Sequence, residues 1–267
     1  MLRNAKELEH YELRARDGKI GHVHDFLFDD RQWVVRYLVI DTGPWLDRRE
    51  VLISPTAVSR AEWDRRLLPV DLTREQVRQS PRVDIEQRLS PEQELALTQY
   101  YSWPMYWGGF PDVGFALPVV PIIPPRAEAT PATEEARHAR AVESSTVAAV
   151  HEDRHLRSVR TVTGHAIEAT DGAIGHVADF LIDDRSWDIR YLLVDTRNWW
   201  PGRKVILAPQ WIREVGWDDA RVHVDLTRTA IKTSPAYDPA APITPDYAGH
   251  LHRHYGRPPP PPPTAYF

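Results

Sequence analysis

The chain contains one sequence twice. A shift of 154 residues aligns Leu13–Pro81 with Ile167–Pro235 without a gap, and 32 of the 69 aligned positions are identical. The turn dipeptide Asp17-Gly18 recurs as Asp171-Gly172. A solenoid repeat has a period of about 20–50 residues and needs more than two copies, so a repeat of this length predicts a duplicated domain. Any function is therefore carried by both copies or by the positions at which they differ.

Composition narrows the classes of protein to consider. The chain has 42% hydrophobic and 27% charged residues, a net charge of −5 and no cysteine. A net negative charge gives no general electrostatic attraction to nucleic acid. We therefore expect no specific nucleic-acid partner. The lack of cysteine excludes disulfides and cysteine metal sites. Because neither an apolar signal sequence nor a run of about 20 apolar residues occurs, we expect a cytoplasmic protein without a transmembrane segment.

The repeat predicts four regions along the chain. Weaker matches continue as far as Tyr101 and Tyr255, which gives two domains of about 100 residues. The sequence leaves open whether the two domains pack together. The predicted boundaries are residues 2–104 for the first domain, 105–155 for a linker that is first proline-rich and then charged, 156–258 for the second domain, and 259–267 for a poly-proline tail.

Short β-strands dominate the prediction within each copy, because β-branched and aromatic runs alternate with turn residues. Six short strands within about 60 residues predict a small closed or partly closed β-barrel. Thr73 and Ser90 each begin a capping-box pattern, so two short helices are expected after the first barrel. In the second copy Thr244 begins the equivalent helix, which Gly249 weakens. The strands predicted in the first copy are Tyr11–Arg16, Lys19–Phe28, Val34–Ile40, Glu50–Ile53, Val58–Trp63 and Leu67–Leu72.

The repeated residues resemble a known family. The pattern Asp-Gly-x-Ile-Gly-His-Val-x-Asp-Phe-Leu-x-Asp-Asp occupies Asp17–Asp30 and Asp171–Asp184, followed by a Trp, by Arg-Tyr-Leu and by Asp-Thr-x-x-Trp. This pattern is similar to that of the PRC-barrel family. The resemblance implies a mainly β fold, with two small PRC-type β-barrels in tandem, each followed by short α-helices, joined by a proline-rich linker.

The family's barrel occurs in the cytoplasmic part of the photosynthetic reaction-centre H subunit and as the C-terminal domain of a 16S ribosomal RNA maturation factor. The resemblance therefore implies docking onto other macromolecules, and no reaction. We expect neither the membrane helix of the first nor the separate N-terminal barrel of the second, because the first PRC-like unit begins almost at residue 1. We expect a non-enzymatic scaffold or adaptor that binds a protein partner. The alternatives are a reaction-centre or electron-transfer-associated protein docked peripherally to a membrane complex, and a ribosome- or RNA-associated assembly factor.

Polar side chains offer several candidate sites, each with a structural alternative. The carboxylates that recur in both copies could bind a divalent cation or relay protons, or they could close turns through backbone N–H groups. His22 and His24 form a His-x-His pair, but Ala178 replaces the second histidine in the other copy. No catalytic residue, metal site or cofactor is therefore predicted. The groups concerned are Asp25, Asp29, Asp30, Asp179, Asp183 and Asp184, with the tail histidines His250, His252 and His254.

Aromatic residues are the favoured candidates for partner binding, because buried Trp and Tyr dominate many interfaces. Trp45 and Trp199 share a position beside a predicted turn, and Trp200 adds a second indole; the alternative is a Trp folded back over the barrel end. A second group follows the first domain and is either a packing strap or a docking patch. Its members are Trp103, Tyr106, Trp107 and Phe110. The poly-proline tail is either a recognised ligand or a spacer.

Overall fold

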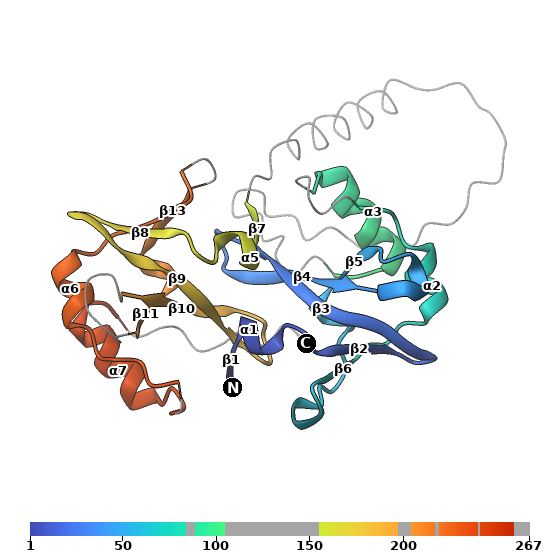
Figure 1. Cartoon of the computed structure of the whole chain (residues 1–267), viewed down its shortest axis with the longest axis horizontal. Helices are drawn as coiled ribbons and strands as arrows, with labels where there is room; N and C mark the ends of the chain where they lie inside the picture. The colour runs from blue at the N-terminus through green and yellow to red at the C-terminus, as the bar shows by residue number, and fades with distance from the viewer. Residues whose placement is uncertain (84–88, 105–154, 197–203, 217–218, 240, 259–267) are drawn as a thin grey trace, which may run out of the picture.

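The computed structural model describes residues 1–83, 89–104, 155–196, 204–216, 219–239 and 241–258. Among these residues no helix is long and apolar enough to cross a membrane. The chain is mainly β, with a six-stranded and a seven-stranded sheet that lie side by side (Figure 1).

The elements of the first copy follow the predicted order closely. Strands β2 to β5 begin and end within two residues of four predicted strands, and both capping boxes begin helices as expected. The elements are β1 (Leu2–Asn4), α1 (Ala5–Leu8), β2 (Glu12–Ala15), β3 (Gly18–Asp29), β4 (Val34–Asp41), β5 (Glu50–Ile53), β6 (Leu67–Pro69), α2 (Arg74–Gln79) and α3 (Pro91–Tyr101), with 3-10 turns at Gly43–Leu46, Pro55–Ala57 and Trp63–Arg65.

The second copy has the same elements and one additional strand. The sheet order β11-β10-β9-β8-β13 matches the order β5-β4-β3-β2-β6 of the first copy. The elements are β7 (Leu156–Ser158), α5 (Val159–Val162), β8 (Ala166–Ala169), β9 (Gly172–Asp183), β10 (Ile189–Asp195), β11 (Lys204–Leu207), β12 (Ile212–Val215), β13 (Arg221–Val224), α6 (Arg228–Thr233) and α7 (Pro245–His254), with a 3-10 turn at Pro209–Trp211.

The predicted strand Val58–Trp63 is wrong for the first copy, whereas its counterpart in the second copy is β12. Only the isolated bridges Val58↔Val70 and Glu62↔Leu67 remain in the first copy. In the second copy Glu214 of β12 pairs with His223 of β13. The residue of the first copy that corresponds to His223 is Pro69. Proline has no N–H to donate to a strand ladder, so the pairing cannot continue there.

Glycine in the repeated Ile-Gly-His motif is required where β3 crosses β4. A Cβ on Gly21 would lie 2.0 Å from the backbone oxygen of Asp41, and a Cβ on Gly175 would lie 2.2 Å from that of Asp195. Such contacts are far inside van der Waals distance, so only glycine fits at either position. β4 is buried along its whole length except for its last residue, Asp41.

The two copies exchange their first strands. β1, at the start of the first copy, pairs with β9 of the second copy, and β7, at the start of the second copy, pairs with β3 of the first (Figure 1). The registers correspond, because Arg3 lies opposite Ile182 and Arg157 opposite Phe28, each pair shifted by 154 residues. The predicted domains therefore pack together, each sheet completed by a strand of the other copy.

Two tryptophans add a second set of matched contacts between the copies. Trp33 and Trp187 have φ of 56° and 61°, a left-handed conformation that is rare for such bulky residues. The Trp33 carbonyl accepts a hydrogen bond from Ile189 N (2.7 Å), and the Trp187 carbonyl accepts one from Val35 N (3.0 Å). The backbone of each tryptophan therefore binds β4 or β10 of the opposite copy.

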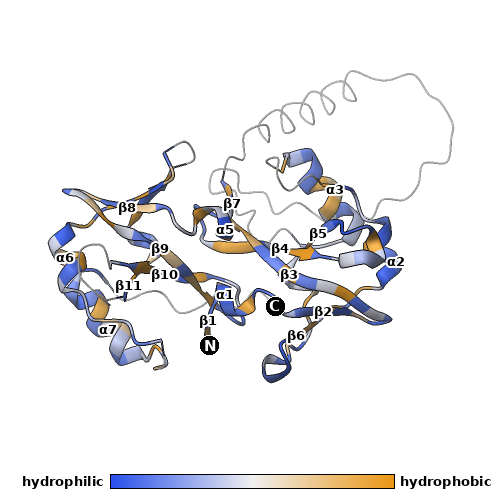
Figure 2. Cartoon of the chain, in the orientation of Figure 1, coloured by the Kyte–Doolittle hydropathy of each residue, from blue (hydrophilic) through white to orange (hydrophobic). Residues whose placement is uncertain are grey.

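The apolar core is continuous across both copies. Phe28 and Phe180 lie on different copies with ring centroids 5.4 Å apart, and both are fully buried. Figure 2 shows hydrophobic residues concentrated along the strands in the middle of the molecule, where the two sheets meet. Since buried apolar area is the main stabilising term in folding, the junction belongs to the core.

Candidate functional site

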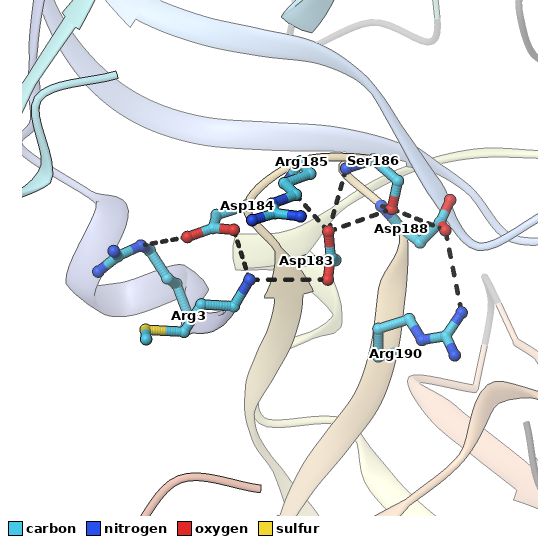
Figure 3. A network of polar contacts seen from close by, with 8 residues as sticks. Arg3, Asp183, Asp184, Arg185, Ser186, Asp188 and Arg190 are labelled. Atoms are coloured by element: carbon cyan, nitrogen blue, oxygen red, sulfur yellow. Dashed lines mark hydrogen bonds and ion pairs between the residues drawn. The ribbon is translucent and has the colours of Figure 1, made fainter. Parts of the chain in front are cut away.

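The repeated acidic residues divide into two groups, and the first group closes turns as predicted. The Asp29 carboxylate accepts hydrogen bonds from Arg31 N (2.7 Å) and Gln32 N (2.8 Å). Asp183 accepts equivalent bonds from Arg185 N (3.0 Å) and Ser186 N (3.1 Å), as Figure 3 shows for this turn. Aspartate is favoured here because its short side chain reaches its own turn.

The second group binds the opposite copy. Asp30 Oδ2 accepts a hydrogen bond from Arg157 Nε of β7 (2.5 Å), and its Oδ1 lies 2.7 Å from His155 Nδ1. Asp184 accepts one from Arg3 Nε of β1 (3.2 Å), and the Met1 ammonium donates to it at 2.5 Å (Figure 3). Arg3 and Arg157 occupy equivalent positions, so the ion pair is duplicated along with the exchanged strands.

Asp25 and Asp179 hold the helices that follow the exchanged strands. Asp25 accepts from Arg160 N of α5 (3.0 Å) and from the Ser158 hydroxyl (2.5 Å). Asp179 accepts from Lys6 N of α1 (3.2 Å). We call these contacts the seam, meaning β1 and β7 together with the carboxylates of Asp25, Asp30, Asp179 and Asp184. The sequence did not reveal that these four carboxylates cross from one copy to the other.

Burial raises the pKa of both Asp25 and Asp179, and that of Asp179 to about 6. Asp25 receives a hydroxyl hydrogen bond that stabilises its ionised form, whereas Asn4, which corresponds to Ser158, makes no side-chain cap for α1. Lys6 and Glu9 act on Asp179 with opposite signs. The carboxyl group of Asp179 therefore has a pKa of about 6, well above the usual range of an aspartate.

We expect Asp179→Asn to remove a pH-dependent part of the stability. The folded state binds the proton more tightly than the unfolded chain, so this group stabilises the fold below about pH 4 and loses that contribution as pH rises through about 6. A shift of about two pKa units corresponds to about 3 kcal/mol. Urea unfolding at several pH values should show the wild-type protein losing about this much relative to the variant between pH 4 and pH 7. A pH-independent difference would contradict the assignment.

A cavity of about 530 Å³ lies at the outer end of the first barrel. The start of β3, the end of β4, the turn Gly43–Leu46 and the first residue of α2 form it. Trp45 lies half-buried in this wall, where its indole Nε1 donates to the Ile20 carbonyl and its ring packs against the core. We call this cavity the Trp45 pocket. The charged and titratable residues that line it are Lys19, His22, Asp41 and Arg74.

Arg74 is positioned by the repeated Asp-Gly turn. The Asp17 carboxylate accepts a hydrogen bond from Arg74 N (2.8 Å). Gly18 has a φ of 143°, and a Cβ built there would lie 3.4 Å from Arg74 Cδ, so the arginine stem runs beside the turn at ordinary contact distance. The guanidinium carbon lies 4.3 Å from the centroid of the Trp45 ring, within the range of a cation–π contact. Asp171 and Arg228 form the same hydrogen bond (2.7 Å) in the second copy.

Comparison with protein-family models gives one match, to the PRC-barrel domain, over residues 2–77. These residues contain β1 to β6 and most of α2, together with the Trp45 pocket. The first copy is a PRC-barrel domain. A search of curated proteins finds no match for the chain. The match ends before the second copy, whose strand order is nevertheless that of the PRC barrel in the first.

The second copy does not reproduce the chemistry of the PRC barrel's pocket. Ala173 stands in place of Lys19, while His176 and Arg228 correspond to His22 and Arg74. The predicted partner-binding residues Trp199 and Trp200 lie outside the described residues. The pocket is therefore described for the first copy alone.

The histidines flagged in the sequence lie in separate places. His24 contacts Arg160 and lies 3.4 Å from Glu50, whereas His22 accepts a hydrogen bond from Lys19 in the Trp45 pocket. In the tail, His252 is 1% exposed with its ring centroid 5.0 Å from that of Trp211. Within the described ranges, no three His, Asp or Glu side chains gather closely enough to hold a metal ion. α7 buries His252, so this histidine packs within the fold.

Trp103 is the member of the second aromatic group that the structure describes. It is 8% exposed, and its ring stacks on Tyr101 with centroids 4.1 Å apart and an interplanar angle of 12°. Its described contacts are those of a packing residue at the end of α3. Tyr106, Trp107 and Phe110, like the linker 105–154 and the tail 259–267, lie outside the described residues.

Proposed function

We propose that this chain is a non-enzymatic, cytoplasmic protein-binding scaffold in which two barrels of the PRC type are held in one fixed arrangement. The observation that carries the proposal is the seam. The four seam carboxylates, which recur as two equivalent pairs, bind the strand or helix of the opposite barrel, so this part of the duplicated polar chemistry joins the barrels.

A fixed pair of barrels favours an adaptor role. Two surfaces held at a constant separation bind two copies of a partner, or one extended surface, with a gain from effective concentration. Membership of the first copy in the PRC-barrel family supports a docking role of this general kind. The Trp45 pocket supplies a candidate contact site, because it combines an aromatic wall with charged side chains at its edge.

Photocrosslinking in the protein's native cells tests the proposal. A photoreactive amino acid at Arg78, whose guanidinium lies 5.9 Å from the Trp45 ring centroid, should give a discrete crosslinked protein that mass spectrometry identifies. The matched position in the second copy is Lys232. A membrane-complex subunit or a ribosomal protein in the product would assign the scaffold to one of those assemblies. Absence of any crosslink from both barrels would argue strongly against a docking role.

A further inference from the structure

We propose that the Trp45 pocket binds an acidic side chain of a partner protein, with the carboxylate held by Lys19 and Arg74 and its methylene groups against the Trp45 ring. This inference rests on the proposed scaffold function and names the chemistry of its partner. The argument depends on which charges around the pocket are already paired and which are not.

Within the described part of the chain, the guanidinium of Arg74 forms no ion pair with a carboxylate. Its buried Nε has no hydrogen-bond partner among the described residues. The guanidinium is nevertheless held in place, over the Trp45 ring at 4.3 Å and beside Gly18. A fixed guanidinium loses little conformational freedom on binding, and its planar fork matches the two oxygens of a carboxylate.

Lys19 adds a second cation, and the rest of the pocket does not cancel it. Its ammonium lies 3.6 Å from Glu12, but Glu12 is already bound to Arg14 at 2.5 Å. Burial, together with the ammonium 2.8 Å away, lowers the pKa of His22, so its ring is neutral at pH 7. The carboxylate of Asp41 accepts a hydrogen bond from Gly43 N (2.8 Å).

The pocket therefore contains two cations, one engaged carboxylate and an aromatic wall. Its volume lies within the range of ligand-binding cavities, about 300–1,000 Å³. The whole chain has a net charge of −5. At distances beyond the pocket, this charge repels a nucleic acid, which is a polyanion. A short acidic peptide, whose glutamate side chains carry far fewer charges than a nucleic acid, fits this local positive charge within an acidic molecule.

The second copy provides a built-in comparison. It retains Arg228 over Gly172 but has Ala173 in place of Lys19. Because alanine occupies that position of the second barrel's equivalent strand, Lys19→Ala is expected to fold normally. Arg228→Glu places the same charge change as Arg74→Glu on the other barrel, and is the matched control.

Fluorescence anisotropy of the full-length protein with a fluorescein-labelled hexaglutamate peptide tests the proposal. We expect saturable binding that weakens as NaCl rises from about 0.01 M to about 0.1 M, where the screening length falls from about 30 Å to about 10 Å. Lys19→Ala should weaken binding about three- to fivefold, as expected for one partly exposed charge. Arg74→Glu should weaken it more than about tenfold, because it replaces attraction with repulsion. Arg228→Glu should leave the affinity unchanged.

Three results would overturn the inference. The first is an absence of saturable binding to hexaglutamate. The second is an equal loss of affinity in the Arg74 and Arg228 variants. The third is binding of a labelled deca-uridine oligonucleotide that is tighter than that of hexaglutamate and depends on Lys19 and Arg74. Unchanged circular dichroism and thermal unfolding of each variant establish that the fold is intact. If the peptide fails to bind while the photocrosslinker at residue 78 still captures a protein, the scaffold function stands and only the acidic partner is excluded.

Discussion

Replacement of Arg36 by methionine is expected to lower the free energy of unfolding by about 3–5 kcal/mol. Arg36 is 3% exposed and holds two carboxylates of the first barrel. Its guanidinium binds Asp29, which is itself 3% exposed, and donates to Glu94 of α3 at 3.2 Å. Removing the cation leaves both carboxylates without their counter-charge in a poorly solvated site. Urea unfolding followed by tryptophan fluorescence and by circular dichroism measures the effect.

Arg190→Met is the matched control, because Arg190 is the counterpart of Arg36. Ala248 corresponds to Glu94, so Arg190 has no counterpart of that carboxylate. Asp188 lies 4.0 Å from Arg190. The side chain of Arg190 is 17% exposed, against 4% for Arg36, so solvent screens its interactions more effectively. We expect a loss of about 1 kcal/mol. Equal losses in the two variants would show that burial of Arg36 is not the cause.

Asp30→Ala is expected to open one half of the seam and to lower the free energy of unfolding by about 3–5 kcal/mol. The substitution removes the acceptor of Arg157, whose side chain is 7% exposed, and the contact with His155. The guanidinium then remains buried between the copies with only part of its hydrogen bonding, including the Val215 carbonyl at 3.0 Å. Amides of β7 that pair with β3 should lose hydrogen-exchange protection before those of β10.

The equivalent change in the other half of the seam, Asp184→Ala, should have a smaller effect of about 1–2 kcal/mol. Arg3 is 16% exposed at its side chain and keeps two other contacts, the Trp63 ring at 4.1 Å and Glu7 at 3.8 Å. It is therefore less dependent on Asp184 than Arg157 is on Asp30. A larger loss in Asp184→Ala than in Asp30→Ala would refute this ordering of the two halves.

Much of the fold is predictable from the sequence, because the strands carry local signals. The run Val34–Ile40 is apolar apart from Arg36 and rich in β-branched and aromatic residues, and β4 is buried on both faces as that pattern indicates. Thr73 and Ser90 carry their capping partners three residues later, and both boxes form. The prediction of a strand at Val58–Trp63 is wrong because of a single residue. That residue, Pro69, lies on the partner strand and not in the segment itself.

The seam is not predictable in the same way. β1 and β7 have three residues each, too few for a periodic pattern, and their partners lie more than 100 residues away along the chain. The sequence does identify the repeated aspartates. However, an aspartate can either close its own turn or bind another barrel, so its presence does not distinguish the two roles. One signal was available, since Arg3 and Arg157 are a repeated arginine pair outside the best-aligned region. For the Trp45 pocket, the tryptophan was identified and the cations beside it were not.

The exchanged strands also constrain the order in which the protein folds during its synthesis. Leu2 pairs with Asp183, so β1 has no partner until some 180 further residues have been synthesised. At about 5–20 residues per second, β1 stays unpaired for roughly 10–35 s after its own synthesis. During that interval the edge of β3 that later receives β7 is also open. On the ribosome, neither barrel reaches its final form before the other, and the two copies mature as one unit.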